Sequence, residues 1–227
     1  MFKKLYSYRF EFFFITQIAV LFGSLFIRGE VFEKSIGPIF FLLNLIAGII
    51  LISKRKDLFW FFLILLIASS TIFAIAQASG EMPLFTSYMQ FGIYFAFYLV
   101  VTYEIIKQVW QSDTVDKKVI YGMASGFISL GLIGFFICMS IEIANPDSFQ
   151  GGLLSQQETL PNTLTEQLMY FSFITMMTIG YGDILPITPL AQKASILIGL
   201  IGQFYLVVIT TVVVGKFINQ KSAKNDS

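Results

Sequence analysis

The residues with the clearest chemical potential lie in one short stretch, 175–183, which reads TMMTIGYGD. Gly180 and Gly182 stand on either side of Tyr181, and glycine reaches left-handed backbone conformations that other residues avoid. A backbone with such conformations can aim several carbonyl oxygens inward, and a dehydrated cation needs oxygen ligands in place of its water. The Thr178 hydroxyl adds an oxygen at one end. The stretch therefore indicates a backbone that coordinates a cation.

The residue inventory excludes most enzymatic chemistry. The chain has no histidine and one cysteine, Cys138, so it cannot form an intrachain disulfide, a Cys/His zinc site, a His-ligated haem or a Ser/His/Asp triad. Glu11, Glu104 and Glu142 lie near the ends of apolar runs, so paired catalytic carboxylates are not expected at midplane depth in a membrane. We expect neither an enzyme nor a cofactor.

The same stretch matches T-x-x-T-x-G-Y-G-D, the signature of potassium channels, and residues 119–216 resemble the two-helix pore module of the bacterial branch of that ion-channel family. Each copy of such a module supplies a quarter of the ring, so the resemblance implies a homotetramer that conducts K⁺. It further implies K⁺ coordination at Thr178, Ile179, Gly180 and Tyr181, a selectivity filter completed by Gly182, and support from Thr175 and Asp183.

Two positions depart from the family pattern. Some members carry an acidic residue behind the filter that pairs with the final Asp, but Ile174 stands there in this chain, so Asp183 lacks that partner. Met176 and Met177 are bulkier than the residues common at their positions. We expect both departures to affect filter stability or inactivation, with little effect on ion choice. The filter is expected to be braced by contacts of its tyrosine with Tyr170, Phe171 and Phe173.

Composition points to the lipid bilayer as the solvent. Of 227 residues, 56% are hydrophobic, 17% aromatic and 13% charged, about half the charged fraction of an ordinary soluble domain. A soluble protein would lack the charge to keep such a surface dispersed. The net charge of +1 gives no reason to expect a nucleic-acid partner. The expected partners are K⁺, membrane lipids and further copies of the chain.

A spanning helix needs about 20 mainly apolar residues, and six runs meet that requirement. We therefore predict an all-α membrane protein with six transmembrane helices, a re-entrant pore helix and a filter loop, with a tight third loop at residues 80–81. The predicted spans are 10–27, 35–53, 58–79, 83–106, 119–143 and 190–215. The predicted divisions are a four-helix domain at 1–106, an amphipathic interfacial linker around Trp110 at 107–118, the pore domain at 119–216 and a cytoplasmic tail at 217–227.

The basic residues predict the orientation. Twelve of the 15 lie at the termini or in the second and fourth loops, and positive charge favours the cytoplasmic side. Both termini are then cytoplasmic in the plasma membrane, of bacterial inner-membrane type, which requires an even number of spans. The polar stretch 145–162 becomes an extracellular loop, and 163–177 becomes the short pore helix. Asn162 or Thr163 is available as its N-cap, and Glu166 lies in its first turn.

The last predicted span carries the candidate gate. Gly199 and Gly202 are either a hinge or a site of close helix packing. Gln203, Leu206, Thr210 and Val214 follow at spacings of 3, 4 and 4, so they share one helix face, which we expect to line the inner cavity rather than to meet a partner helix. Gly122 and Gly126 form a G-x-x-x-G pattern typical of packing.

The remaining sequence favours a passive channel. Residues 58–103 contain no Lys or Arg, so opening is expected to depend little on voltage, and Lys107 is interpreted as a topology anchor. Only 11 residues follow Lys216, too few for a regulatory domain. The first four helices are a degenerate sensor, a lipid- or tension-responsive scaffold, or a docking surface. The leading function is K⁺-selective conduction; the alternatives are a weakly selective cation channel and the pore subunit of a potassium uptake transporter.

Overall fold

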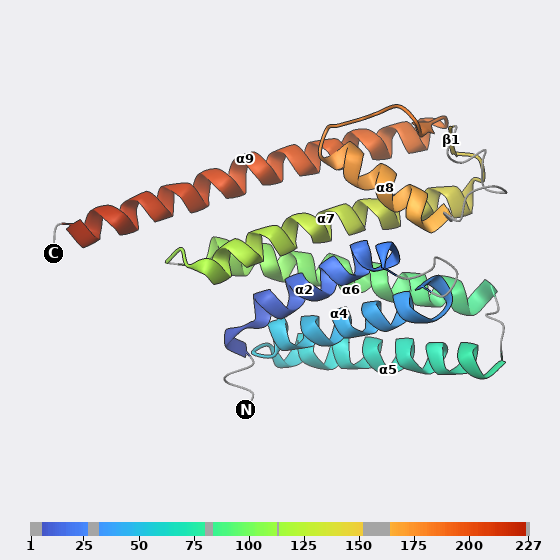
Figure 1. Ribbon diagram of the computed structural model, residues 1–227, viewed down its shortest axis with the longest axis horizontal. Coiled ribbons are helices and arrows are strands. Elements are labelled where there is room, and N and C mark those ends of the chain that lie inside the picture. Colours follow the sequence, from blue (N-terminus) through green and yellow to red (C-terminus); the bar gives the residue numbers. More distant parts are fainter. Residues whose placement is uncertain (1–5, 27–31, 80–83, 113, 152–163, 226–227) are drawn as a thin grey trace. The chain divides into compact units, whose positions relative to one another are not determined.

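The computed structural model describes residues 6–26, 32–79, 84–112, 114–151 and 164–225, and these residues are mostly helical (Figure 1). The chain divides into two compact units, Met1–Gly126 and Phe127–Ser227. The helical fold class predicted from the sequence is confirmed, apart from one pair of two-residue strands. The tight loop predicted at residues 80–81 lies outside the described residues.

The first unit is built from helices that pack in sequence order. Helix α2 packs on α4, and α4 packs in turn on α5 and α6. Its elements are α2 (Arg9–Phe22), the 3-10 turn η1 (Gly23–Leu25), the π-helical turn η2 (Phe32–Ile36), α4 (Gly37–Ile52), α5 (Lys56–Ser79), α6 (Leu84–Trp110) and the start of α7 (Lys117–Ala144).

Among the described residues, four helices are long and apolar enough to cross a membrane: α5, α6, α7 and α9 (Pro189–Asn225). This result supports a membrane protein. The first two predicted spans are helical but shorter, because α2 has 14 residues and α4 has 16. Helix α6 continues through Trp110, so the first four residues of the predicted linker 107–118 are helical. Helix α9 likewise continues well past the predicted limit at residue 215.

Aromatic rings fill the core of the first unit. Phe13, Phe62 and Phe97 are fully or almost fully buried, and the Phe97 ring centroid lies 6.2 Å from that of Phe13 and 5.0 Å from that of Phe62. The Phe97 ring packs over Gly48, where an added Cβ would lie 2.5 Å from a ring carbon. The missing side chain of Gly48 therefore lets α4 approach α6 closely.

A buried asparagine joins three of these helices. Asn44 of α4 has no exposed surface, and its amide donates to the Thr16 hydroxyl (2.8 Å) and to the Phe13 carbonyl (3.4 Å) of α2. Its carbonyl accepts a hydrogen bond from the Tyr98 hydroxyl of α6 at 2.8 Å. Since a buried polar group is costly unless it is hydrogen-bonded, these bonds fix how α2, α4 and α6 pack together.

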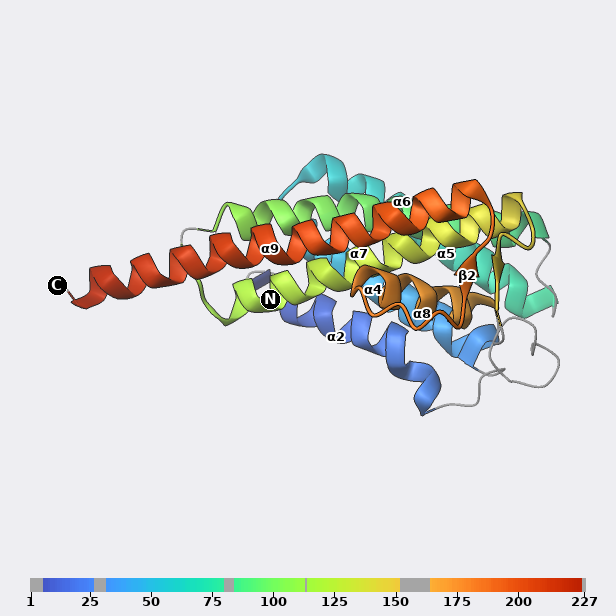
Figure 2. The ribbon, with the colours of Figure 1, turned by 90° about the horizontal axis from the view of Figure 1, so that it is seen from above.

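The second unit contains the end of α7, β1 (Phe149–Gln150), α8 (Leu164–Met176), β2 (Leu185–Pro186) and α9. Helix α8 lies beside the first part of α9 (Figure 2). The Ser172 hydroxyl of α8 is buried and donates to the Gly131 carbonyl of α7 at 2.8 Å. Residues 178–183 follow α8 directly, so α7 and α9 hold the candidate site through this short helix.

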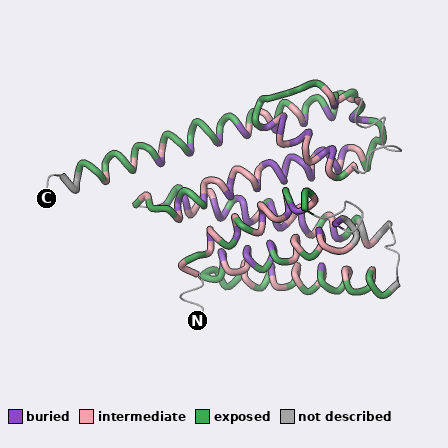
Figure 3. Tube along the Cα trace, in the orientation of Figure 1, coloured by how far each residue is buried: buried purple, intermediate pink, exposed green. Residues whose placement is uncertain are grey.

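Only one stripe of α9 is buried, and most of the helix is exposed (Figure 3). Tyr205 belongs to the stripe, and its ring centroid lies 6.0 Å from that of Phe127 in α7. The stripe recurs at spacings of 3 or 4 residues, as one face of a helix requires. Its members are Ala191, Ala194, Ile198, Gly202, Tyr205, Ile209 and Val213.

Replacing Asn44 with leucine should destabilise the first unit. The variant removes hydrogen bonds to α2 and α6, and such bonds inside membrane proteins contribute roughly 0.6–1.7 kcal/mol each. Thermal unfolding of the purified protein in detergent should show a lower midpoint for Asn44→Leu. The matched control is Leu43→Ala, since Leu43 is 45% exposed and should tolerate the change. An Asn44→Leu midpoint equal to wild type would contradict this role.

Candidate functional site

The helix before the glycine-containing stretch is short and ends in a defined cap. Helix α8 has 13 residues, or roughly 20 Å of length, and therefore cannot cross a hydrocarbon core of about 30 Å. The sequence predicted a helix over 163–177, and the observed bounds agree closely. The predicted N-cap residues, Asn162 and Thr163, lie outside the described residues. Glu166 lies in the first turn, as predicted.

The C-terminal cap of α8 is a Schellman motif. The Thr178 N–H donates to the Thr175 carbonyl at 3.0 Å, and the Ile179 N–H donates to the Ile174 carbonyl at 2.9 Å. Thr178 has a left-handed φ of 58°. Two such bonds around one left-handed residue define the motif, in which glycine is the usual left-handed residue. The cap of the helix is therefore also the start of the candidate cation site.

Left-handed residues then alternate with residues of ordinary φ. Thr178, Gly180 and Gly182 have φ values of 58°, 56° and 79°, whereas Ile179 and Tyr181 are not in the left-handed region. The sequence analysis expected a left-handed φ at Gly180 and Gly182, but it did not predict the left-handed φ of Thr178. When left-handed residues alternate with residues of ordinary φ, successive peptide N–H groups point to one side of the backbone. The carbonyl groups then point to the opposite side.

These carbonyls have free capacity to bind. In the part of the chain that the structure describes, no hydrogen bond reaches the carbonyl oxygens of residues 178–182. The same residues are exposed in the single chain, and Tyr181 is 71% exposed. No group of three or more Asp, Glu, Cys or His side chains that could hold a metal occurs among the described residues. The oxygens that this stretch offers to a cation are its backbone carbonyls and the Thr178 hydroxyl.

Gln203, one of the predicted cavity residues, contacts the first residue of this stretch. The Gln203 amide of α9 donates to the Thr178 hydroxyl at 3.3 Å, and that hydroxyl donates to the Met177 carbonyl at 2.7 Å. The three other residues of the predicted cavity face are also exposed in the single chain. They are Leu206, Thr210 and Val214.

Asp183 has a partner that the sequence analysis missed. The Tyr170 hydroxyl of α8 donates to its Oδ2 at 2.6 Å, and the Ile184 N–H donates to its Oδ1 at 3.1 Å. Ile174 is buried and supplies no such group. Tyr170 precedes Ile174 by one helical turn, so it lies on the same face of α8. The Tyr170 phenol therefore holds the Asp183 carboxylate, although the acidic partner found in some members of the family is absent at position 174.

The aromatic residues expected to brace Tyr181 have other partners within the chain. Tyr170 is bonded to Asp183, the Phe171 ring lies 5.2 Å from that of Phe149, and the Phe173 ring packs over Gly131. The two phenylalanine contacts hold α8 against α7 and β1, and the Tyr170 bond holds α8 against the residue that follows Gly182. Long-range ring contacts of this kind leave no local sequence pattern.

The segment after Asp183 pairs with the loop that follows α7. Strands β1 and β2 are antiparallel, with Phe149 opposite Pro186 and Gln150 opposite Leu185. Gly151 packs so closely on the Asp183 carbonyl that an added Cβ would overlap it. The Asp183 end of the candidate site is thus attached to the start of the stretch 145–162, which the sequence analysis predicted to be an extracellular loop.

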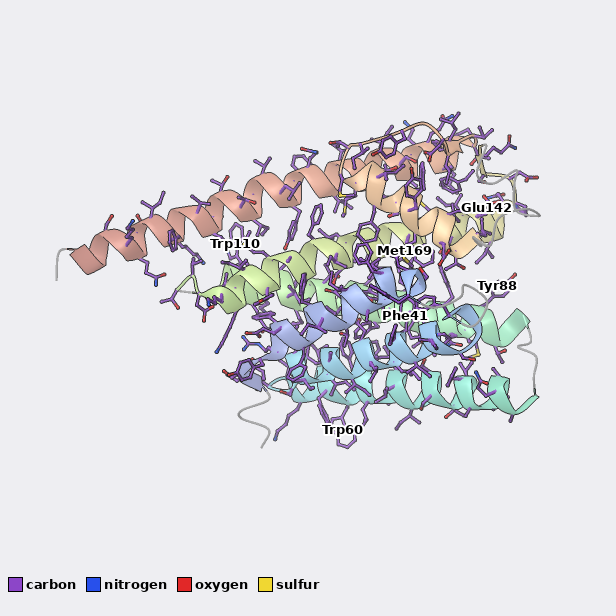
Figure 4. All side chains as sticks on the ribbon, viewed as in Figure 1. Phe41, Trp60, Tyr88, Trp110, Glu142 and Met169 are labelled. Atoms are coloured by element: carbon purple, nitrogen blue, oxygen red, sulfur yellow. The ribbon has the colours of Figure 1, made fainter. Side chains whose placement is uncertain are left out.

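Glu142 organises that loop from the end of α7 (Figure 4). Its two carboxylate oxygens accept hydrogen bonds from the backbone N–H groups of Asp147 (2.8 Å) and Phe149 (3.1 Å). The Ser148 carbonyl accepts the Ile187 N–H at 2.8 Å. These bonds connect α7, β1 and the segment after β2 into one support for the outer end.

The two candidate hinge glycines differ in their surroundings. At Gly202 an added Cβ would overlap the Met176 carbonyl and lie 2.5 Å from Met176 Cγ, whereas at Gly199 the nearest atom is the Thr175 carbonyl at an ordinary 3.8 Å. Gly202 is therefore a point of close packing between α9 and the end of α8. This geometry favours the packing interpretation for Gly202.

Gly202→Ala should destabilise the second unit, and Gly199→Ala should not. A backbone carbonyl cannot move aside as a side chain can, so the alanine at 202 should cost about 1–3 kcal/mol. The measurement is the thermal unfolding midpoint of each purified variant in detergent. If both variants keep the wild-type midpoint but alter opening, the hinge interpretation would be correct and the packing interpretation wrong.

The chain was compared with models of known protein families, with curated proteins and with solved structures. Residues 127–219 match the family model described as an ion channel, and this range contains α8, the stretch 178–183 and most of α9. Comparisons with curated proteins and with solved structures gave no match. The second unit of the chain is therefore similar to an ion-channel domain.

Proposed function

We propose that this chain is a potassium-selective channel that conducts K⁺ passively across the plasma membrane. The observation that carries the proposal is the alternation of left-handed φ at Thr178, Gly180 and Gly182, with five successive carbonyls that accept no hydrogen bond among the described residues. Backbone carbonyls that replace the hydration shell of an ion are the basis of K⁺ selectivity in channels. In this proposal K⁺ is coordinated at Thr178, Ile179, Gly180 and Tyr181.

Residues around these carbonyls have supporting roles in the proposal. Thr175 accepts a cap hydrogen bond, and Asp183 fixes the outer end through Tyr170. Gln203 reaches the inner end, which supports an α9 face lining a cavity below the filter. The C-terminal end of α8 also directs partial negative charge toward the site, which favours a cation.

The weakly selective cation channel and the transporter subunit are less consistent with the chain. Tyr181 is retained between two glycines with left-handed φ, so the ordered stretch is not shortened. A transporter subunit usually carries four degraded filter loops, whereas this chain has one intact copy.

The proposed topology has six spans, with both termini in the cytoplasm. Turns η1 and η2 extend the two short helices, so that η2 and α4 together cover residues 32–52, about the length that a span needs. Voltage is expected to have little effect on opening, because residues 58–103 carry no basic side chain to move in the field.

Reconstituted protein should pass K⁺ and Rb⁺ and exclude Na⁺ and Li⁺ in a liposome flux assay. Gly182→Ala should abolish flux, because a non-glycine residue in the left-handed region costs roughly 1–2 kcal/mol and its side chain would alter the carbonyl positions. The matched control is Gly215→Ala in α9, where no atom lies within 4 Å of an added Cβ; it should conduct normally. Equal passage of Na⁺ and K⁺ would remove the claim of selectivity.

Purified particles should be fourfold symmetric. One chain supplies one filter strand and leaves it exposed, so closure of a ring requires further copies. The mass of the particle in detergent and averaged electron-microscope images would both test this number. Twofold particles would exclude a homotetramer without bearing on whether the pore selects K⁺.

A further inference from the structure

Several segments of the first unit meet at one end of its helices. The Arg9 Nε of α2 donates to the Gln108 side chain of α6 at 3.0 Å, and the Gln108 amide reaches the Leu51 carbonyl of α4 at 3.5 Å. The Lys118 ammonium at the start of α7 donates to the Ser7 hydroxyl at 2.7 Å. Figure 1 shows the starts of α2 and α5 and the ends of α4 and α6 at this end.

Two cations at this end share one aromatic ring. The Arg9 guanidinium carbon lies 4.3 Å from the centroid of the Tyr6 ring, and the Lys54 ammonium lies 4.6 Å from the same centroid. Arg9 also donates to the Tyr6 carbonyl at 3.3 Å. Cation–π contacts and carbonyl bonds position a cation without neutralising it. Tyr6 thus contacts two cations that both keep their full positive charge.

The carboxylates at this end do not neutralise the pair. Glu104 is buried and forms an ion pair with Arg55 at 2.7 Å, which is the one ion pair within the described ranges. Asp116 accepts the backbone N–H groups of residues 118 and 119 as the cap of α7. Glu11 and Asp57 also lie near this end, but neither lies within ion-pair distance of Arg9 or Lys54.

Exposed aromatic side chains surround the same end. Tyr8 and Trp110 are each 50% exposed, and Trp60 and Tyr103 are 62% and 63% exposed; Figure 4 shows Trp60 directed away from its helix. Tyr and Trp are enriched where a membrane protein meets the lipid headgroups. If this end lies at the membrane interface, as these aromatic residues indicate, the phosphates of lipid headgroups would be anions within reach of the paired cations.

We propose that Arg9, Tyr6 and Lys54 form a binding site for the headgroup phosphate of an anionic phospholipid. Basic pockets between helices on the cytoplasmic side are suited to such headgroups, and an arginine fork matches phosphate oxygens. The bound lipid joins α2, the α4–α5 turn and, through Gln108, α6. The inference requires that the chain lies in a membrane, but it does not depend on K⁺ selectivity.

Equilibrium binding of a fluorescent-tailed phosphatidylglycerol to the full chain in neutral detergent micelles tests the site. Saturable binding is expected, with competition by unlabelled phosphatidylglycerol and little competition by phosphatidylcholine or inorganic phosphate. The double variant Arg9→Gln/Lys54→Gln should weaken binding at least about tenfold. Tyr6→Leu keeps both charges but removes their shared ring, and should weaken binding about threefold if the cation–π contacts position them.

The matched control is Lys56→Gln/Lys107→Gln, which removes two positive charges at the same end without touching Tyr6. It should weaken binding less than about threefold. Equal losses in both double variants would show diffuse attraction and overturn the site. Displacement by inorganic phosphate as effective as by phosphatidylglycerol would indicate a soluble anion and overturn the lipid assignment. If the first double variant does not elute as the wild type on gel filtration, Tyr6→Leu with wild-type affinity would overturn the proposal.

Discussion

Placing a backbone carbonyl at membrane depth costs free energy when the carbonyl has neither water nor a hydrogen-bond donor as a partner. In the proposed channel, residues 178–182 would place five such carbonyls in succession, and none of the five accepts a hydrogen bond from the described residues. The surrounding structure must hold this unfavourable arrangement in place. The cap of α8 fixes its inner end, the Tyr170 bond to Asp183 and the β1–β2 pair fix its outer end, and the close approach at Gly202 fixes α9 beside it. A dehydrated cation is the natural partner for oxygens arranged in this way.

Thr178 shows that a strained backbone is accepted where a side chain is needed. Glycine would satisfy a φ of 58° without strain, whereas threonine there costs roughly 1–2 kcal/mol. The hydroxyl that glycine lacks accepts a hydrogen bond from Gln203 and donates one to the Met177 carbonyl. Since both contacts lie at the inner end of the stretch, the strain and the polar contacts of Thr178 belong to one local arrangement.

Local patterns predicted most helices and the left-handed φ of the two filter glycines, because both depend mainly on residue types that are close in the sequence. The bounds of α7 and α8 agree with expectation within two residues. Two-residue strands have no periodicity to detect, and the bonds of Glu142 and Tyr170 depend on side chains that meet only after folding. The sequence also could not separate a hinge glycine from a packing glycine, since that distinction depends on where the Met176 carbonyl lies.

The two Schellman bonds join residues only three and five positions apart. A contact between residues so near in the sequence costs little chain entropy and forms early in folding. Each chain therefore forms the first left-handed turn of the carbonyl stretch without help from a second copy. In the proposed homotetramer, association would bring together chains in which this turn is already ordered, which lowers the ordering entropy of assembly. Slow steps in that assembly would then reflect the packing of helices and loops rather than the folding of this turn.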